Sequence, residues 1–341
     1  MSDTGRTSST ARAAVLERPA PIDDEPLVIS ALPASRLAPT DVLIDVAACG
    51  VCRTDLQLCE GDLAARVLPV VPGHQIVGRV RAIGDEVQGL QLGDRVGVAW
   101  IAYSCGTCRF CESGRENLCE SARFTGWDRN GGFAEQATAD HRFVYHLPPG
   151  GDDDQLAPLL CGGVIGYRCL RVAGATAGQR LGLYGFGASA TIVIQIARHL
   201  GCEIYVATRR AEEQARALRL GATWAGSYDE RPPRALDAAI TFAPAGDVVI
   251  AALAAVDRGG TVVINAIHLD RIPEFAYDLL WWERSLRSVA NVTRDDVRAL
   301  LELAPAVPIV TERVTYRLGD ANRALRDLRD GHVAGAAVLR P

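Results

Sequence analysis

The chain has 341 residues, 48% of them hydrophobic, and a formal net charge of −5, which fits a globular protein of one or two domains. Its basic residues are scattered, which argues against nucleic acid as the main partner. No apolar run is long enough to span a bilayer, and the polar N-terminus lacks a signal-peptide core. We therefore expect a cytoplasmic protein without a membrane partner, and we predict that residues 1–12 are disordered.

The first part of the chain has the composition of a β-domain. Residues 13–150 contain short apolar runs, such as DVLIDVAACG at 41–50 and QIVGRVRAIG at 75–84, broken by turn residues. This pattern predicts a barrel or sandwich of short strands. The segment LPPGGDDDQLAPLL at 147–160 predicts a turn followed by the start of a helix.

From about residue 161 to 295, apolar strands alternate with amphipathic helices, which is typical of a doubly wound parallel sheet. Strands are expected at 180–187, 202–210, 236–243 and 260–267, and helices at 188–201 and 211–222. The last stretch, 296–341, contains two expected helices and two strand-like segments. We expect it to return to the first domain.

Four of the ten cysteines lie within fifteen residues, at Cys105, Cys108, Cys111 and Cys119. Four thiolates at this spacing can close a tetrahedron around zinc, and a closed shell of this kind has a structural role. A loop with one disulfide and an iron–sulfur site are the alternatives. The long chain without an export signal favours metal over disulfides.

Three further residues form a second candidate metal site. Cys52, His74 and Cys161 are far apart in sequence, but each stands close to a glycine that lets backbone approach a neighbouring group. Two thiolates and one imidazole leave the fourth position on zinc open, which is the pattern of a catalytic site. Taken singly, each has another interpretation, as a buried cysteine or a structural histidine.

A dinucleotide site is predicted at GFGASA, residues 185–190, which follows an expected strand and opens an expected helix. Its glycines allow backbone amides to approach a pyrophosphate at the helix N-terminus. The amides of Ala188 and Ser189 are expected to be among them. At the end of the next strand, Thr208, Arg209 and Arg210 stand where an acidic residue would bind the ribose of NAD. They favour the 2′-phosphate of NADP(H), although the two arginines could also be a solvated helix start.

The chain resembles the zinc-containing medium-chain dehydrogenases, the family of liver and yeast alcohol dehydrogenases. The resemblance runs from about residue 13 to the end, in the family's order. It rests on the four-cysteine lobe and on CGVCRTD at 49–55, PVVPGHQIVGRV at 69–80, GGFAEQ at 131–136, PLLCGGV at 158–164 and the glycine motif Gly185–Gly187 with its neighbours.

The resemblance implies a GroES-like domain with both zinc sites at 1–160 and 296–341, a Rossmann cofactor domain at 161–295, and an active site in the cleft between them. It also implies a homodimer or homotetramer assembled through the Rossmann domain, for which residues 250–267 could supply the sheet edge. The activity implied is hydride transfer between a small primary alcohol or its aldehyde and a nicotinamide cofactor.

By the same resemblance, Cys52, His74 and Cys161 hold the catalytic zinc and Asp55 orients His74. Thr54 matches the hydroxyl that hydrogen-bonds the substrate oxygen and begins proton release. Two positions depart from the family. Gln75 replaces a common glutamate after the histidine ligand, and Gln57 replaces a relay histidine, so that protons would leave through Thr54, the cofactor ribose and water.

Further positions follow from the resemblance. Gly335-Ala336 stands where relatives often have Gly-Arg, which leaves Arg53 as the expected phosphate partner. Trp100 matches a pocket aromatic of yeast-like relatives. The other expected pocket residues are Cys59, Ile101 and Trp127.

Three rival functions are considered. The nearest is an aldehyde or imine reductase on the same scaffold, which would work mainly in the reductive direction. A different class is a non-catalytic zinc protein that uses the four-cysteine lobe to bind nucleic acid or a partner. A zinc-free quinone reductase is disfavoured, because both ligand sets are present.

Overall fold

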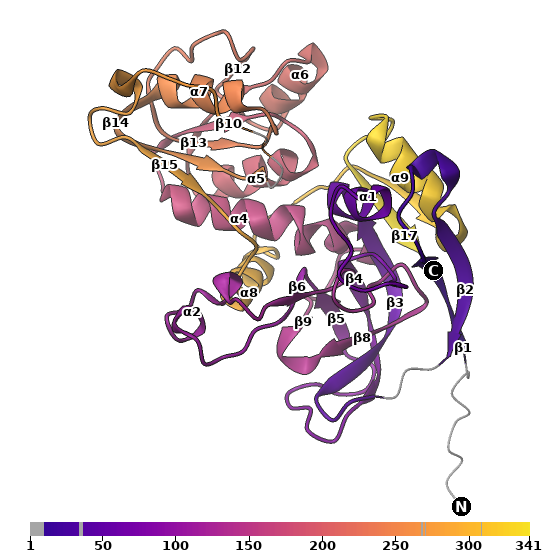
Figure 1. Cartoon of the computed structure of the whole chain (residues 1–341). Coiled ribbons are helices and arrows are strands. Elements are labelled where there is room, and N and C mark those ends of the chain that lie inside the picture. Colours follow the sequence, from indigo (N-terminus) through magenta and orange to yellow (C-terminus); the bar gives the residue numbers. More distant parts are fainter. Residues whose placement is uncertain (1–9, 34–36, 267–268, 270, 308) are drawn as a thin grey trace, which may run out of the picture. The chain divides into compact units, whose positions relative to one another are not determined.

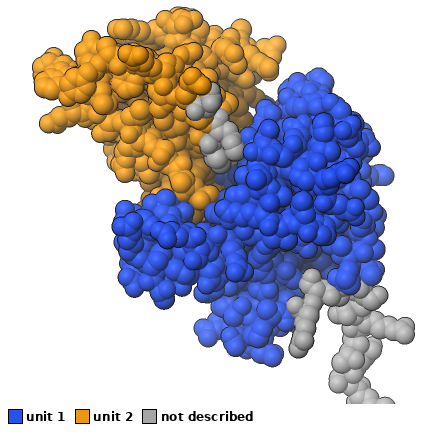
Figure 2. All heavy atoms as spheres, in the orientation of Figure 1, with its two compact units in different colours: residues 1–161, 312–341 blue, residues 162–311 orange. Residues whose placement is uncertain are grey.

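The computed structural model describes residues 10–33, 37–266, 269, 271–307 and 309–341 (Figure 1). The chain divides into two units, of which unit 1 comprises residues 1–161 and 312–341 and unit 2 comprises residues 162–311 (Figure 2). Unit 1 is mainly β-structure and unit 2 is a parallel α/β unit. The predicted fold class is therefore confirmed.

Unit 1 is organised around one long strand, β3 (Asp41–Val51). Its alternating sequence buries Val42, Ile44, Val46 and Ala48 on one face, as a half-buried strand requires. β3 pairs antiparallel with β4 (Gln75–Ile83), β8 (Gln136–Asp140) and the C-terminal strand β17 (Ala336–Arg340). Of the stretch predicted to return to the first domain, residues 312–341 do so, whereas residues 296–311 belong to unit 2.

The remaining elements of unit 1 complete this sheet or cover it. The sheet order is β16-β17-β3-β4-β5-β9, and β1 and β2 form a separate hairpin. Their bounds are β1 (Thr10–Leu16), β2 (Leu27–Pro33), α1 (Arg53–Glu60), β5 (Arg95–Val98), β6 (Ile101–Tyr103), α2 (Arg109–Glu112), β7 (Arg123–Phe124), β9 (Val144–His146), α3 (Asp153–Leu156), β16 (Arg313–Arg317) and α9 (Ala321–Arg329).

Unit 2 is a six-stranded parallel sheet of order β12-β11-β10-β13-β14-β15, with helices on both faces (Figure 1). The chain order reverses between β10 and β13, so this is a doubly wound sheet with its switch point there. Its elements are α4 (Gly162–Ala173), β10 (Arg180–Tyr184), α5 (Ala188–His199), β11 (Glu203–Ala207), α6 (Ala211–Arg219), β12 (Trp224–Gly226), β13 (Leu236–Thr241), α7 (Gly246–Ala255), β14 (Val256–Ile264), β15 (Ser285–Ser288) and α8 (Arg294–Leu303).

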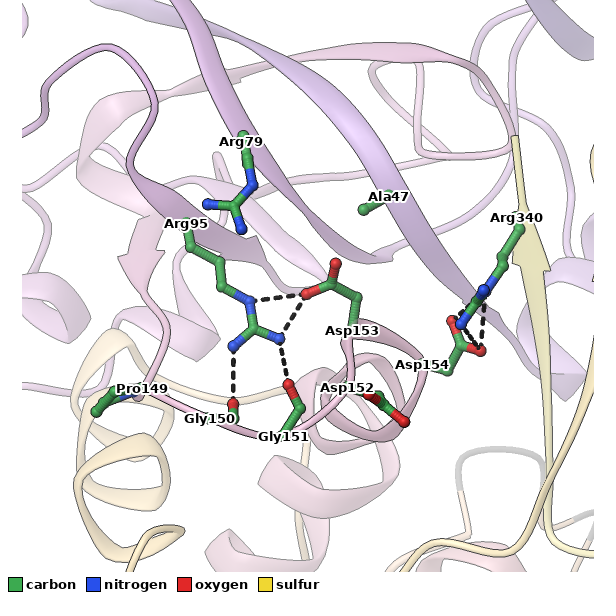
Figure 3. A pocket seen from close by; sticks show the side chains of 10 residues that line it. All are labelled: Ala47, Arg79, Arg95, Pro149, Gly150, Gly151, Asp152, Asp153, Asp154 and Arg340. Atoms are coloured by element: carbon green, nitrogen blue, oxygen red, sulfur yellow. Dashed lines mark hydrogen bonds and ion pairs between the residues drawn. The ribbon is translucent and has the colours of Figure 1, made fainter.

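Figure 3 shows a charged pocket of unit 1 beside the turn at residues 149–154. Arg95 donates to Asp153 at 2.7 Å and to the carbonyl oxygens of Gly150 and Gly151 at 2.8 Å each. Arg340 donates to Asp154 at 2.8 Å. These charges are paired with one another, and they fix the turn that leads through α3 to Cys161.

Two predicted boundaries need correction. β1 begins at Thr10, so residues 10–12 are a strand rather than disordered, and Arg12 pairs with Glu135 at 2.7 Å; residues 1–9 lie outside the described part. The second domain ends at 311 instead of 295, because Asp296 of α8 binds Arg168 and Arg171 of α4, each at 2.6 Å.

The expected sheet edge also needs correction. β14, which lies within residues 250–267, pairs with β13 on one side and β15 on the other. β15 is therefore the edge strand on this side of the sheet, and β12 is the edge strand on the other. Within the described residues no single helix has the length and hydropathy of a membrane span; only the segments Asp153–Leu160 and Gly162–Ala173 meet these criteria together.

We expect the Asp296 carboxylate to contribute measurably to the free energy of unfolding of unit 2. Its side chain is fully buried, and it accepts from Arg168, Arg171 and the backbone amide of Thr293. Replacing Asp296 with Asn leaves two arginines without a counter-charge and should lower the free energy of unfolding by about 2–3 kcal/mol. Asp295→Asn is the matched control, because the neighbouring Asp295 side chain is 77% exposed and its change should cost below about 0.5 kcal/mol.

Urea unfolding at several pH values gives a second readout. Burial alone would raise the pKa of Asp296, but the Thr293 amide and the Arg168 guanidinium outweigh it and hold this pKa below its usual value. The stabilisation is thus present above the unfolded-state pKa of about 3.9 and is lost as the pH falls through the lower folded-state pKa. A difference between Asp296→Asn and wild type that is the same at pH 7 and pH 3 would contradict this.

Candidate active site and metal centres

The first candidate ligand, Cys52, is held by the start of helix α1. Cys52 is the N-cap residue, and its Sγ accepts from the Thr54 amide at 3.3 Å while the Asp55 carboxylate accepts from the Cys52 amide at 2.9 Å. This reciprocal capping box fixes the thiol at the helix N-terminus. The helix dipole there favours a thiolate.

His74 is positioned by Gly73, which precedes it in the chain, and by the Asp55 carboxylate, which contacts its ring. At Gly73, φ is +95°, and a Cβ would lie 2.4 Å from the Phe133 ring, so only glycine allows this approach. The Asp55 carboxylate lies 3.2 Å from His74 Nδ1 and accepts from the Gly73 amide at 3.0 Å. The bond at Nδ1 leaves Nε2 of the imidazole facing the two cysteines.

The structure brings Cys52, His74 and Cys161 together, all within unit 1. Their candidate ligand atoms lie within 4.8 Å of one another, and His74 Nε2 is 3.4 Å from each sulfur. A tetrahedral zinc with Zn–S of about 2.3 Å and Zn–N of about 2.0 Å separates such atoms by about 3.5 Å. The donor set therefore fits zinc, with three protein ligands and a fourth position for another group.

Charge in this site also favours a cation. The Cys161 thiol and the nearby imidazole lower the pKa of Cys52 well below its usual range. Burial alone would lower the pKa of His74, but Cys52 and Asp55 outweigh it and raise the pKa of His74 to about 10. With no metal bound the imidazole therefore takes a proton, and a metal ion that binds there must displace it.

The second ligand set is the lobe at Cys105, Cys108, Cys111 and Cys119, whose four sulfurs lie within 4.8 Å of one another. The Cys105–Cys119 and Cys108–Cys111 sulfurs are 3.5 Å apart, and those of Cys105 and Cys111 are 3.9 Å apart. Four sulfurs around one tetrahedral zinc lie about 3.8 Å apart. All four cysteines are free thiols, so the disulfide alternative is not supported.

Backbone amides favour the thiolate form of one of these four cysteines. The amides of Thr107 and Cys108 lower the pKa of Cys105 to about 6, because both donate to its sulfur. Cys105 is thus a thiolate at neutral pH, the form that binds metal.

An aromatic wall lies beside the catalytic ligands. The Trp100 ring contacts the His74 ring edge-on, with 4.6 Å between the ring centroids. It stacks on the rings of Trp127 and Phe124, with centroid distances of 5.9 Å and 5.1 Å. The guanidinium carbon of Arg66 lies over the Trp127 ring, 3.7 Å from its centroid. Phe124 and Arg66 were missed from the sequence, because their stacking depends on contacts between separate loops.

The other expected pocket residues behave differently. Cys59 and Ile101 have no exposed surface, and Cys59 belongs to the hydrophobic core of unit 1. Neither side chain is open to a substrate, so both are left out of the proposed pocket.

The two glutamines that depart from the family both lie near the ligands in sequence. Gln75 is buried at the start of β4 opposite Gly50, where a Cβ would come within 2.5 Å of its Oε1. Gln57 lies on α1, one turn after Thr54, and its buried Oε1 has no hydrogen-bond partner among the described residues. An acceptor of this kind can receive a proton donor that is not part of the chain.

In unit 2, the glycine motif has the geometry of a dinucleotide cradle. Gly185 has φ of +93° at the end of β10, and α5 begins at Ala188, with Ser189 next to it. A Cβ built at Gly187 would meet nothing within 4 Å, so the N-terminus of α5 is open to an anion. The residues fit the pyrophosphate of a nicotinamide dinucleotide.

The end of β11 shows a feature that the sequence interpretation missed. Thr208 is buried, and its hydroxyl donates to the Glu213 carboxylate of α6, while Arg209 and Arg210 are exposed. The signal was present in the sequence as an acid five residues after Thr208. It lies outside the strand end at residues 208–210, where a residue that selects the cofactor is expected.

Arg53 is the last of the residues predicted to contact phosphate. Arg53 is the exposed first residue of α1 in unit 1. Gly335 has φ of +81° and Ala336 begins β17, where its amide donates to Glu312. The role of Arg53 stays a prediction.

The fold and these sites define a zinc-binding oxidoreductase with a dinucleotide domain. Residues 38–149 match the alcohol dehydrogenase GroES-like domain, and residues 190–306 match the zinc-binding dehydrogenase domain. The chain is 48% identical to a probable alcohol dehydrogenase of Mycobacterium tuberculosis over 98% of each chain. It is 32% identical to an alcohol dehydrogenase of Geobacillus stearothermophilus, over 89% of this chain and 93% of that one.

A solved cinnamyl alcohol dehydrogenase from Sorghum bicolor superposes with a TM-score of 0.86 at 26% identity, over 97% of both chains. The chain therefore belongs to the zinc-containing alcohol dehydrogenase family of medium-chain dehydrogenases. It is an oxidoreductase for small alcohols and aldehydes, and a non-catalytic zinc protein or a zinc-free quinone reductase no longer fits.

The contact between Asp55 and His74 leads to a testable prediction. Asp55→Asn keeps the size of the side chain but removes the charge that fixes the orientation of His74. It should weaken zinc affinity at the Cys52 site by about 10–100-fold. The measurement is zinc release to a competing chelator, and Asp62→Asn, an exposed acid just after α1, is the control. Equal release from both variants would show that the carboxylate does not support the metal.

Proposed function

We propose that the chain transfers hydride between small primary alcohols or aldehydes and NADP(H), in preference to NAD(H), with the reactive zinc held by Cys52, His74 and Cys161. The observation that supports this most directly is the spacing of these three ligands, which suits zinc and leaves a fourth position. Zinc in such a site polarises an alcohol or carbonyl oxygen as a Lewis acid.

The chain's own residues divide the remaining work. Thr54 is held beside Cys52 by its backbone amide, and we assign its hydroxyl to the substrate oxygen as the first proton acceptor. Asp55 keeps His74 in the ligating orientation. Trp100 contacts His74 and Trp127 stacks on Trp100, so both belong to an apolar wall near the ligands, which favours aromatic or medium-chain substrates.

The cofactor preference rests on the strand end in unit 2. Thr208 places no charge there, and the exposed Arg209 and Arg210 follow at once. Guanidinium groups bind phosphate in a bidentate way, which favours a 2′-phosphate. The amides at the start of α5, with Ala188 and Ser189, are assigned to the pyrophosphate.

Assembly and location extend the proposal. The edge strand β15 leaves backbone groups available for pairing, and exposed aromatic side chains stand next to it at Tyr277, Trp281 and Trp282. We propose a homo-oligomer, a dimer or a tetramer, that forms through this side of unit 2. A cytoplasmic location stays a prediction.

Two zinc ions per chain are expected, one in each ligand set. Cys105→Ser should reduce the zinc content of the purified protein from two per chain to one and lower its thermal stability, because a structural site contributes directly to folding. Elemental analysis measures this, and Cys202→Ser, whose thiol lies outside both sets, should keep both ions. Iron with a visible absorption band would contradict the assignment to zinc.

The proposed function is tested by following NADPH and NADH consumption in parallel with a simple aromatic aldehyde. Faster NADPH loss that stops on adding a zinc chelator is expected. Thr54→Ala should lower kcat about 100-fold at unchanged zinc content, whereas Thr54→Ser should retain most of the rate. Faster NADH loss would overturn the cofactor preference, and unchanged kcat in Thr54→Ala would remove Thr54 from the chemistry.

A further inference from the structure

The adenosine side of the proposed nucleotide site can be located from backbone contacts in unit 2. The amide of Gly185, the first glycine of the motif, donates to the carbonyl oxygen of Ala207 at 2.8 Å. Thr208 follows Ala207 at the end of β11, so it stands beside the loop that would hold the pyrophosphate. In doubly wound sheets, the residue at this strand end meets the ribose of the adenosine.

Helix α6 is fastened to the same place by three contacts. The Thr208 hydroxyl donates to the Glu213 carboxylate. Gln214 Nε2 donates to the Thr208 carbonyl at 2.9 Å, and Arg216 Nη2 donates to the Phe186 carbonyl within the glycine motif at 2.8 Å. The first two turns of α6 thus lie against both the strand end and the motif.

The position of Glu213 follows from these contacts. Glu213 and Arg216 are three residues apart and share one face of α6, and Arg216 on that face reaches the motif. Thr208 is only 2% exposed, so its hydroxyl is a fixed donor that holds the carboxylate at the strand end. A carboxylate has about four lone-pair sites, so one bond from Thr208 leaves it able to accept another donor.

We propose that Glu213 is a specificity-determining residue of the nucleotide site, supplying from helix α6 the negative charge that β11 lacks at its end. Its carboxylate accepts a hydrogen bond from the ribose 2′-hydroxyl of NAD(H) and repels the 2′-phosphate of NADP(H). Glu213 therefore opposes Arg209 and Arg210 and restrains the NADP(H) preference. This inference rests on the nucleotide site of the proposed function.

Glu213 also acts electrostatically on Tyr228, which lies near Thr208. Burial raises the pKa of Tyr228, the Thr208 hydroxyl and Arg209 act in the opposite direction, and the charge of Glu213 adds to the rise. Tyr228, Thr208, Arg209 and Glu213 therefore share one small region. The two arginines are exposed and screened by water, whereas the carboxylate is half-buried and hydrogen-bonded, so its effect per charge is larger.

The test compares the binding of 5′-AMP and 2′,5′-ADP to the full-length, zinc-loaded protein by calorimetry, without any turnover. Glu213→Gln keeps the shape and the acceptor for Thr208 but removes the charge. It should bind 2′,5′-ADP about ten-fold more tightly and 5′-AMP several-fold more weakly than wild type. Glu212→Gln makes the same change in net charge at the exposed neighbouring residue and should leave the ratio of the two affinities unchanged.

Each other outcome decides against the proposal in a distinguishable way. An unchanged ratio, an equal loss for both ligands, or the same shift in Glu212→Gln would overturn the role of Glu213 while leaving the nucleotide site in place. Failure of wild type to bind either ligand would overturn the nucleotide site as well. If Glu213→Gln does not fold, Thr208→Val removes the donor that holds the carboxylate, and its ratio should shift towards 2′,5′-ADP.

Discussion

The region around His74 concentrates groups that are costly to bury together. Cys52 and Cys161 bind metal only as thiolates, and the Asp55 carboxylate lies on the other side of the same imidazole. Uncompensated charge in such a place costs several kcal/mol per ion, and a divalent cation offsets this cost. With no metal bound, the negative charges of Cys52 and Asp55 raise the pKa of His74 to about 10 despite burial, which shows how strongly this place favours a positive charge. The local structure around these groups serves to keep them together.

Three arrangements within unit 1 meet this constraint. A capping box fixes Cys52 and Asp55 at the start of α1, so that one carboxylate binds both the helix start and the histidine. Gly73 lets the backbone pass against Phe133, which a side chain would prevent. Arg95 donates to the carbonyl oxygens of Gly150 and Gly151, and Arg340 donates to Asp154, so that both hold the turn that leads to Cys161. The ligands therefore come from three distant segments, each fixed by its own neighbours before metal enters.

What could be predicted from sequence follows the range of the interactions. The four-cysteine lobe, the glycine motif and the strands around them are encoded by local spacing. β10, β11 and β13 lie within the ranges predicted for them, whereas β14 begins at Val256, four residues before the predicted start at 260. The domain boundary at 295 was wrong because it depends on Asp296 meeting Arg168, which is 128 residues away. Residues 10–12 were expected to be disordered because their strand is recognisable only through its partner β2. Glu213 was missed for the same reason, since its importance comes from the contact between α6 and Thr208.

Gln75 bears on how strongly the metal site can act on a substrate. The groups that contact His74 carry at most three negative charges, from Cys52, Cys161 and Asp55, and Gln75, the buried residue that follows His74, adds no fourth. A carboxylate at that position would hold a cation more tightly and would also neutralise more of its field. A neutral amide leaves a larger part of the positive charge directed at the group in the fourth position. With zinc in the proposed site, glutamine at this position would lower the metal affinity and strengthen the pull on the substrate oxygen, and Asp55 would then be the carboxylate that helps to retain the ion.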